Sequence, residues 1–410
     1  MDLKSLIAKK DEAAQYMLKE ITHICKNLPK RDPGSEGEKL SCEYMAKVLK
    51  DDCGCERADV ESFKENPGSF YGWIYITVTC MLIALVAFFF VPWVSVILIV
   101  AGLTLAVLQF GLYKKAVDWM FPEKTGHNVT AIKKCTGEVK RRIFFNGHPD
   151  AAWEWPVNYK LGGVGFESHA IIGFAGAFYY LALSIIKTIK IANGTGGPDT
   201  LKKCALCGLI FLPFWLGLYF MWNKKIVVDG ANDNLTGCYM GISILKQLHD
   251  QGVSLENTEV GVILSGSEEA GLRGAKAWAE AHKGEFDDVP TVIISYDTIH
   301  DPKYLMVNYR DLNGTVKTDK AVSDLMMQAA KDLDIHILKG MVPPMGGATD
   351  PAAFAQAGYR ATSITGLNHK LEDYYHTRKD TYTNMNLQGL ADCYAVSVRA
   401  LEMFDDGALD

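Results

Sequence analysis

Five short stretches of the sequence carry histidine or carboxylate side chains, the residue types that bind divalent metal ions such as zinc. A pair of such ions about 3.5 to 4 Å apart can activate a water molecule and polarise a carbonyl group together. The sequence therefore predicts a two-metal site. The candidate ligands are His148 in NGHPD, Asp233 in DGANDNLTG, Glu268 and Glu269 in SGSEEAG, Asp297 in SYDT and His376 in YYHTRKDT.

Charge balance assigns different roles to the two adjacent glutamates. Two zinc ions carry four positive charges, which three carboxylates and one hydroxide would balance, and Asp233, Glu269 and Asp297 can supply the carboxylates. Where a chain is extended, neighbouring side chains point in opposite directions. We therefore expect Glu269 to bind metal and Glu268 to act as the general base, which takes a proton from water and returns it to the leaving amine.

Two further acidic residues are expected to position the histidines. Asp150 follows His148 by two residues, where its carboxylate can hold the other nitrogen of the imidazole ring. Asp380 is expected to order the loop behind His376 by capping or hydrogen bonding.

The pattern of the elements that must position these residues indicates an α/β fold. Strand-like runs rich in β-branched residues alternate with helical patterns, and in open α/β sheets ligands collect at the carboxyl ends of the strands. The sequence thus predicts a mixed, mostly parallel sheet flanked by helices. The run RRIFFNG leads to His148, TEVGVILSGS leads to Glu268 and Glu269, and TVIISY leads to Asp297.

Two long apolar regions predict membrane-spanning helices. Residues 71–113 contain no charged side chain, and about 20 apolar residues suffice for one span. We expect helices over 72–91 and 93–112, and a second pair over 170–186 and 204–222. The alternatives are a buried helical pair in a soluble core for the first region, and an interfacial or partly re-entrant pair for the second.

The apolar regions interrupt a discontinuous catalytic domain. Each predicted hairpin enters and leaves the bilayer on one face, so the polar pieces can assemble into a single domain. The catalytic domain would comprise residues 1–69, 113–162 and 224–410, with transmembrane hairpins at 70–112 and 163–223.

Charge and leader patterns predict partners and location. With 42 Lys plus Arg against 48 Asp plus Glu, nothing attracts nucleic acid, and we expect none as a partner.

No signal peptide precedes the polar first 70 residues, and ten cysteines without regular spacing favour a reduced compartment. We therefore expect an integral, multi-pass membrane protein with about four helices and a cytosolic catalytic domain. Lysines flank both ends of the second hairpin, so the positive-inside rule does not decide its orientation.

The motifs, taken in order, resemble those of a known family. The series GHPD, GANDN, SGSEEAGLRGA, SYDT and YYHTRKDT resembles the di-zinc aminopeptidase family that includes secreted bacterial leucyl aminopeptidases and glutamate carboxypeptidases. The amino-terminal NLPKRDPGSEGEKLSCEYMAKVLK resembles the family's opening helix, so the likeness covers nearly all of the non-membrane chain. The sequence departs from the family in its two hairpins, and in ATDPAAF, where Asp350 receives no catalytic role.

The resemblance implies two zinc ions and a ligand set. His148 and Asp297 would hold one ion, Glu269 and His376 the other, and Asp233 would bridge them. The catalytic residues that the resemblance implies are Glu268 as base, Asp150 as the partner of His148, and Tyr375 as a hydroxyl near the developing oxyanion.

Taken singly, each residue also has a structural interpretation. His148 and Asp297 would more often be solvated or capped loop residues, Asp233 could cap the following helix in competition with Asn234, and the glutamate pair could begin a solvated helix. Their joint occurrence in the family's order favours metal binding.

The predicted function is a membrane-anchored di-zinc exopeptidase acting on peptides, with aminopeptidase activity favoured. Arg360 and Arg378 keep a carboxypeptidase open as an alternative, because either arginine could bind a substrate carboxylate. A single-zinc glutaminyl cyclase is disfavoured by the presence of the whole ligand set. The remaining alternative is a catalytically silent membrane scaffold of the same fold. The sequence does not indicate an oligomeric state.

Overall fold

The computed structural model describes residues 3–195, 199–368 and 372–410. The chain divides into two compact units. The first comprises Met1–Pro67, Glu123–Trp153 and Ile226–Asp410, and the second comprises Gly68–Pro122 and Glu154–Lys225.

The first unit is built on an eight-stranded sheet with the order β1-β2-β6-β3-β7-β12-β8-β11. Strand β3 pairs in parallel with β6 and β7, β12 pairs in parallel with β7, and β11 pairs in parallel with β8. The β1–β2, β2–β6 and β12–β8 pairs are antiparallel. The expected mixed, mostly parallel sheet is confirmed. The strands are β1 Arg57–Glu65, β2 Lys124–Lys133, β3 Arg141–Gly147, β6 Thr258–Ser265, β7 Thr291–Ile299, β8 Met306–Asn308, β11 Leu338–Gly340 and β12 Arg360–Gly366.

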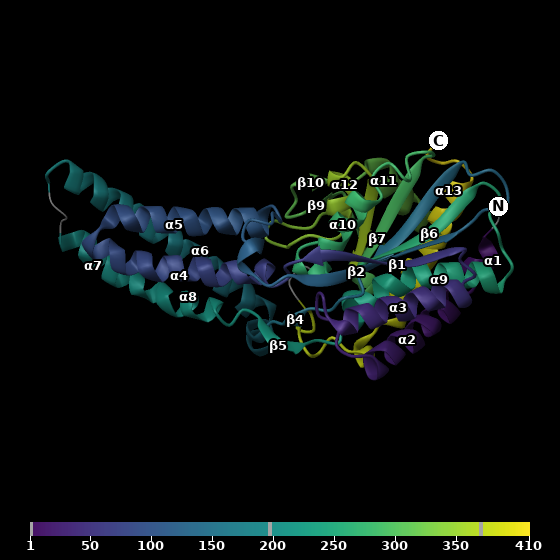
Figure 1. Ribbon diagram of the computed structural model, residues 1–410, viewed down its shortest axis with the longest axis horizontal. Helices are drawn as coiled ribbons and strands as arrows, with labels where there is room; N and C mark the ends of the chain where they lie inside the picture. Colours follow the sequence, from purple (N-terminus) through teal and green to yellow (C-terminus); the bar gives the residue numbers. More distant parts are fainter. Residues whose placement is uncertain (1–2, 196–198, 369–371) are drawn as a thin grey trace. The chain divides into compact units, whose positions relative to one another are not determined.

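Helices cover both faces of this sheet because its central strands are apolar on both sides. Phe145 of β3 contacts the face occupied by α9, and the adjacent Phe144 packs edge-to-face against Trp278 of α10 on the other face. Helices α2, α3 and α9 lie on the first side, and α10 and α12 on the second (Figure 1). The helices are α1 Lys4–Ile7, α2 Lys10–Asn27, α3 Glu36–Asp51, α9 Thr236–Asp250, α10 Arg273–Ala281, α11 Lys320–Asp332, α12 Pro351–Gln356 and α13 Leu387–Asp405.

The register of the central strands aligns their carboxyl ends. Gly147 at the end of β3 lies opposite Leu264 of β6, and Asn146 lies opposite Ser295 of β7. All residues of β6 and β7 are buried. The loops that follow β3 and β6 and the last residues of β7 therefore meet at one edge of the sheet.

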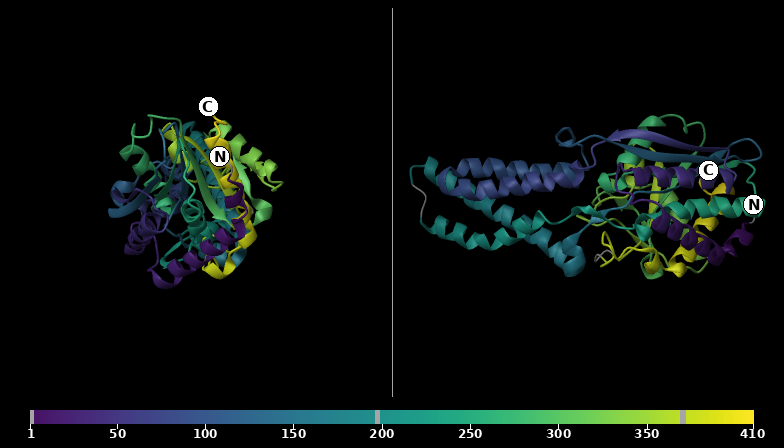
Figure 2. Two further views of the ribbon diagram at one scale, coloured as in Figure 1. Left: turned by 90° about the vertical axis from the view of Figure 1, so that its right-hand side faces the viewer. Right: turned by 60° about the horizontal axis from the view of Figure 1, so that its bottom comes forward.

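The two ends of the chain pack together in the first unit. The backbone N–H of Leu3 donates to Glu402 of α13 at 2.8 Å, and the marked ends lie close to each other in both views of Figure 2.

Two short pairs complete the strands: β4 Trp153–Glu154 with β5 Asn223–Val227, and β9 Arg310–Asp311 with β10 Val316–Lys317.

Among its described residues, the second unit contains four helices that are long and apolar enough to cross a membrane. The first two match the expected spans closely. The third begins earlier than expected, because the less apolar residues before 170 are also helical, with a break at Gly162, whose φ of 69° suits glycine. The four candidate spans are Ser69–Phe90 (α4), Pro92–Gly111 (α5 Pro92–Ala106 with a π-turn), Pro156–Ala192 (α6) and Asp199–Leu218 (α7 Asp199–Cys207, a 3₁₀ turn and α8 Leu212–Leu218).

Small and polar residues pack the helices of this unit. Gly102 lies against Thr77, whose hydroxyl donates to the Gly102 carbonyl at 3.2 Å. The hydroxyls of Ser95 and Ser184 lie 2.9 Å apart. Small residues and interhelical hydrogen bonds of this kind are typical of helix packing in membranes, where no hydrophobic effect drives association.

Candidate metal centre

The five predicted metal ligands converge at the carboxyl edge of the sheet. His148 directly follows β3, Asp297 lies in β7, and Glu269 lies in the 3₁₀ turn Glu268–Ala270 after β6. Asp233 precedes α9, and His376 comes from the loop before α13. All five are buried, with at most 8% of the residue surface exposed.

The ligands form two groups that share Asp233. The first comprises His148, Asp233 and Asp297, and the second comprises Asp233, Glu269 and His376; within each, one ligand atom per residue lies within 4.8 Å of the others. Asp233 Oδ1 lies 3.4 Å from His148 Nε2, and Asp233 Oδ2 lies 3.1 Å from His376 Nε2. Each carboxylate oxygen thus faces a different group, as a bridging ligand requires.

The chemistry of the two groups fits divalent cations. Buried polar atoms are normally hydrogen-bonded, yet His148 Nε2, Asp233 Oδ2 and Glu269 Oε1 are buried without a hydrogen-bond partner among the described residues. Two imidazoles and three carboxylates are the nitrogen and oxygen donors that zinc prefers. The site therefore fits zinc in the type and the charge of its donor atoms.

Without metal, protons bind tightly at the centre. Burial alone would lower the pKa of His376, but the charge of Glu269 and the contacts with Asp233 outweigh it and raise the pKa to about 10. Burial and the charge of Asp233 raise the pKa of Asp297 to about 8. Crowded carboxylates thus hold protons where cations would otherwise balance their charge.

We expect zinc to stabilise the chain more at high pH than at low pH. The raised pKa of His376 gives the metal-free fold stability below its unfolded pKa of about 6.5, and this contribution is lost as the pH rises towards 10. The raised pKa of Asp297 acts in the same direction between about pH 4 and pH 8. The chelated chain should therefore unfold at a lower temperature at about pH 8 than at about pH 6.

The affinity of the site for zinc should rise with pH, because fewer protons compete for the ligands at high pH. The stability of the metal-free chain should fall over the same range. Thermal unfolding of chelated and zinc-loaded protein across this pH range measures both effects. An increase of the melting temperature by zinc that shrinks between pH 6 and pH 8 would contradict the assigned ligands.

The two glutamates lie in a tight turn, so the expectation of an extended chain is wrong at this point. Ser267 and Gly271 adopt left-handed backbone angles on either side of the 3₁₀ turn, which closes the chain instead of continuing the strand. The side chains still contact different partners. Glu269 Oε1 lies 3.1 Å from His376 Nε2, and Glu268 Oε2 lies 3.7 Å from His148 Nε2.

Asp150 holds the glutamate turn as well as lying beside His148. Its Oδ1 lies 3.4 Å from Nδ1 of His148, close to the predicted contact. In addition, its two oxygens accept the backbone N–H groups of Glu268 and Glu269, each at 3.0 Å. Asp150 thus connects the His148 loop to Glu268, the predicted base, and to Glu269, a predicted ligand of the other group.

A buried pair of carboxyl groups, which the sequence did not reveal, holds the turn from behind. Ser267 Oγ lies 2.7 Å from Glu38 and 2.6 Å from Glu65. One hydroxyl has one proton to donate, so one carboxyl group must supply the second proton. Burial raises the pKa of Glu65 to about 7. Glu38 also accepts the backbone N–H groups of Gly34 and His127.

We expect Ser267→Ala to lower kcat by about 10- to 100-fold, the usual cost of removing a partner that orients a metal site. The hydroxyl anchors the left-handed residue that precedes the base, and without it two buried carboxyl groups lose their shared partner. Ser41→Ala is the matched control, because Ser41 is equally buried and its hydroxyl has no partner among the described residues. Equal kcat values for the two variants at full zinc occupancy would refute this role.

Asp380 and Asn234 fix the backbone around Asp233. Asp380 accepts the N–H groups of Asn232 and Asp233 at 2.9 and 3.1 Å, a contact additional to its expected role behind His376. The peptide bond between Asp233 and Asn234 is cis. Asn234 Oδ1 accepts the N–H of Gly237 at the start of α9, so the capping role belongs to Asn234 and leaves Asp233 free to bind metal.

Tyr375 and Asp350 also lie near the ligands. The Tyr375 ring stacks on His376 with 4.1 Å between centroids. Burial and the charges of Asp233 and Glu269 raise its pKa well above the ordinary value, so the phenol keeps its proton. The buried Asp350 accepts a hydrogen bond from Ser265 at 2.5 Å.

Part of the sequence, and the fold, are similar to those of known proteins. Residues 219–401 match Peptidase family M28. The chain is similar to an aminopeptidase from Aneurinibacillus sp. strain AM-1, with 14% identity, a TM-score of 0.56, and coverage of 95% of this chain and 93% of that one. It is also similar to a zinc aminopeptidase from Bacillus subtilis (12% identity, TM-score 0.54, 94% of each chain).

A third similar structure is the glutaminyl cyclase of an Acidobacteriales bacterium, with 12% identity, a TM-score of 0.56, and coverage of 97% and 95% of the two chains. Such low identities show a shared fold. No curated protein matches the chain. Four of the five ligand residues fall within the matched segment, and His148 precedes it. Residues 219–401 therefore match Peptidase family M28, in agreement with the order of the motifs, and the chain shares its fold with the aminopeptidases named above.

Proposed function

We propose that the protein is a membrane-anchored aminopeptidase that uses two zinc ions. The observation that carries the proposal is the position of Asp233, whose two oxygens face two separate histidine-containing groups. A site for a single ion would not need both groups.

Each residue of the centre has a distinct role in this proposal. His148 and Asp297 would hold one ion, Glu269 and His376 the other, and Asp233 both. Bound zinc would activate the attacking water and polarise the peptide carbonyl.

The acid–base work falls to the chain's own residues. Glu268 lies beside the ligand groups without belonging to either. It would accept the proton of the attacking water and return it to the leaving amine. Burial raises the pKa of its carboxyl group well above the ordinary value in the metal-free protein. Asp150 keeps the base oriented through the backbone, and the protonated Tyr375 can donate to the oxygen that gains charge.

The two hairpins would anchor this domain in the bilayer. The proposed catalytic domain comprises residues 1–69, 113–162 and 224–410, with hairpins at 70–112 and 163–223. An even number of spans leaves all catalytic pieces on one side, which we propose to be the cytosol. A tag at the carboxyl terminus should then become accessible to antibody only after the cells are permeabilised, and labelling of intact cells would reverse the orientation.

Hydrolysis assays on the full chain in detergent test the proposed activity. We expect release of chromophore from aminoacyl anilides with a free amino group, none from their acetylated counterparts, and loss of activity with a chelator. Cleavage restricted to amino-blocked peptides with a free carboxyl terminus would indicate a carboxypeptidase instead. Zinc-loaded protein that hydrolyses no anilide or peptide would indicate a scaffold.

Glutaminyl cyclase activity is a second candidate, favoured by the fold that the chain shares with that enzyme. A peptide with an amino-terminal glutamine distinguishes the two reactions by mass. Cyclisation removes ammonia from the intact peptide, whereas an aminopeptidase releases free glutamine. We expect free glutamine, because the complete two-group ligand set matches hydrolysis by a metal pair.

A further inference from the structure

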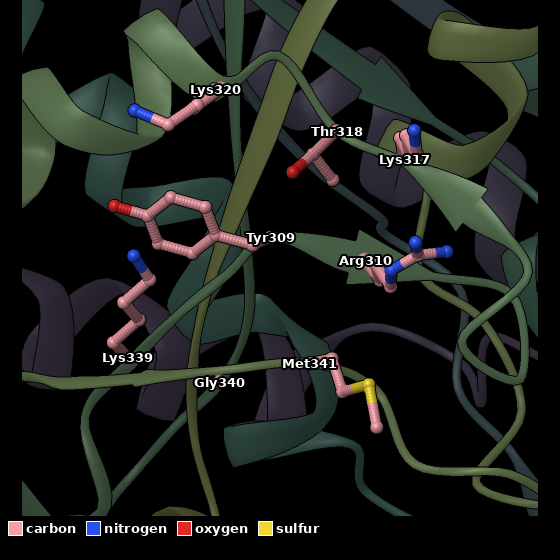
Figure 3. Close-up of a pocket in the computed structure, with 8 residues that line it drawn as sticks. All are labelled: Tyr309, Arg310, Lys317, Thr318, Lys320, Lys339, Gly340 and Met341. Carbon is pink, nitrogen blue, oxygen red and sulfur yellow. The ribbon is translucent and has the colours of Figure 1, made fainter.

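A cationic pocket lies at the β11 end of the strand order, whereas the residues of the metal centre lie at the central strands β3, β6 and β7. Its volume is about 500 Å³, and four of its lining side chains are positively charged. Figure 3 shows Lys320 above and Lys339 below the Tyr309 ring, and Arg310 and Lys317 at the right of the view. No lining residue is acidic.

The pocket is built on the outermost strand of the sheet. Strand β11 pairs with β8 and ends the strand order, and Tyr309 N–H donates to the Gly340 carbonyl at 2.9 Å. The short β9–β10 pair forms the other wall, joined to the residues after β11 by a hydrogen bond from Val342 N–H to the Arg310 carbonyl at 3.0 Å. Backbone pairing therefore fixes the positions of the charged residues.

Most of the positive charge in the pocket has no acidic partner. Lys320 pairs with Asp324, which also accepts a hydrogen bond from the Tyr309 hydroxyl. Lys339 Nζ lies 4.2 Å from the centroid of the Tyr309 ring. Across the described part of the chain, neither Arg310 nor Lys317 forms an ion pair with a carboxylate. Among the described residues, Lys320 is thus the one pocket cation that forms an ion pair with a carboxylate, in a chain whose net charge is −6.

Two of these cations occupy an unfavourable pairing. Arg310 and Lys317 lie directly opposite each other across the β9–β10 ladder. Like charges at opposed positions destabilise a strand pair. A bound anion would remove this repulsion, because both charges could then interact with it.

We propose that this pocket binds an acidic segment of an extended peptide. An extended peptide can add to an exposed sheet edge such as that of β11. Cations on both sides of Tyr309 suit carboxylates spaced along one chain, and Tyr309 and the exposed Met341 offer apolar contact between them. The inference goes beyond the proposed peptidase activity, since binding here requires neither metal nor turnover.

Fluorescence anisotropy on chelated full-length protein tests the proposal. The probe is a labelled peptide of about eight alternating glutamate and valine residues, blocked at both ends and long enough for one strand. We expect binding that weakens with added salt, and none for the same peptide with glutamine in place of glutamate.

The variant Lys317→Glu separates binding from folding. It places an acid opposite Arg310, so the melting temperature should stay the same or rise. Affinity for the acidic peptide should fall by about tenfold or more as one cation is lost and an anion is introduced. The control Lys283→Glu makes the same charge change at an exposed residue outside the pocket, and should alter affinity by less than about twofold.

Three results would overturn the proposal. The first is equal weakening by the two variants, which would mean that only net charge attracts the peptide. The second is equal binding of the glutamate and glutamine peptides. The third is binding of pyrophosphate, sensitive to Lys317→Glu, by a protein that does not bind the acidic peptide; the pocket would then be a phosphate site.

Discussion

Replacing Glu268 by glutamine is expected to lower kcat by about 10³-fold without loss of zinc, in the range usual for a general acid–base residue. Glutamine preserves the size of the side chain but cannot accept the proton of the attacking water. The effect should fall on kcat more than on KM, because proton transfer occurs only in the transition state. Steady-state kinetics with an aminoacyl anilide and zinc analysis of the same preparation measure both quantities.

The matched control is Glu256→Gln, which removes one carboxylate from an exposed loop and should leave kcat unchanged. Loss of zinc from Glu268→Gln would show that Glu268 is a ligand, so that the roles of the two neighbouring glutamates would be reversed. Unchanged kcat would remove Glu268 from the mechanism altogether.

Replacing Asp233 by asparagine is expected to weaken zinc binding by about 100-fold or more, above the effect of losing an indirect partner. Asp233 belongs to both ligand groups, so one substitution removes a negative charge from both ions. Asparagine preserves the shape of the Asp233 side chain but leaves His148 and His376 without the carboxylate that they share. Zinc titration against a chromophoric chelator measures the affinity, and activity at limiting zinc should fall with it.

The corresponding control is Asp250→Asn at the end of α9, where the carboxylate pairs with Lys246 on the surface. Surface ion pairs contribute about 0 to 1 kcal/mol, so this variant should bind zinc like the wild type. If Asp233→Asn retained two zinc ions with unchanged affinity, Asp233 would not bridge the centre.

The strands that carry the candidate ligands can be predicted from the sequence, because apolar runs are local patterns. The apolar runs before His148 and around Asp297 are strands β3 and β7, and their parallel pairing brings both residues to one edge. The residue types at that edge are the basis for the proposed ligand set.

The residues that hold the ligands are harder to find, because their partners are distant in the chain. Glu38 and Glu65 reach Ser267 across more than 200 positions, and no local pattern signals such a contact. The tight turn at Glu268 was missed for a related reason. Ser267 adopts a left-handed conformation that its residue type rarely takes, and buried hydrogen bonds from other elements support it.

The four candidate membrane spans can be predicted for a different reason, since length and hydropathy alone identify them. The bounds of the second pair are less accurate, because the structure has Pro156–Ala192 and Asp199–Leu218 where the sequence predicts 170–186 and 204–222. Residues 156–169 carry polar side chains that lower the hydropathy, yet they continue the helix across the break at Gly162.

Anomalous diffraction at the zinc absorption edge tests the central claim most directly. Crystals of the zinc-loaded full chain should show two peaks, one beside His148 and Asp297 and one beside Glu269 and His376, with Asp233 contacting both. A single peak, or zinc bound away from these five residues, would contradict the two-metal centre.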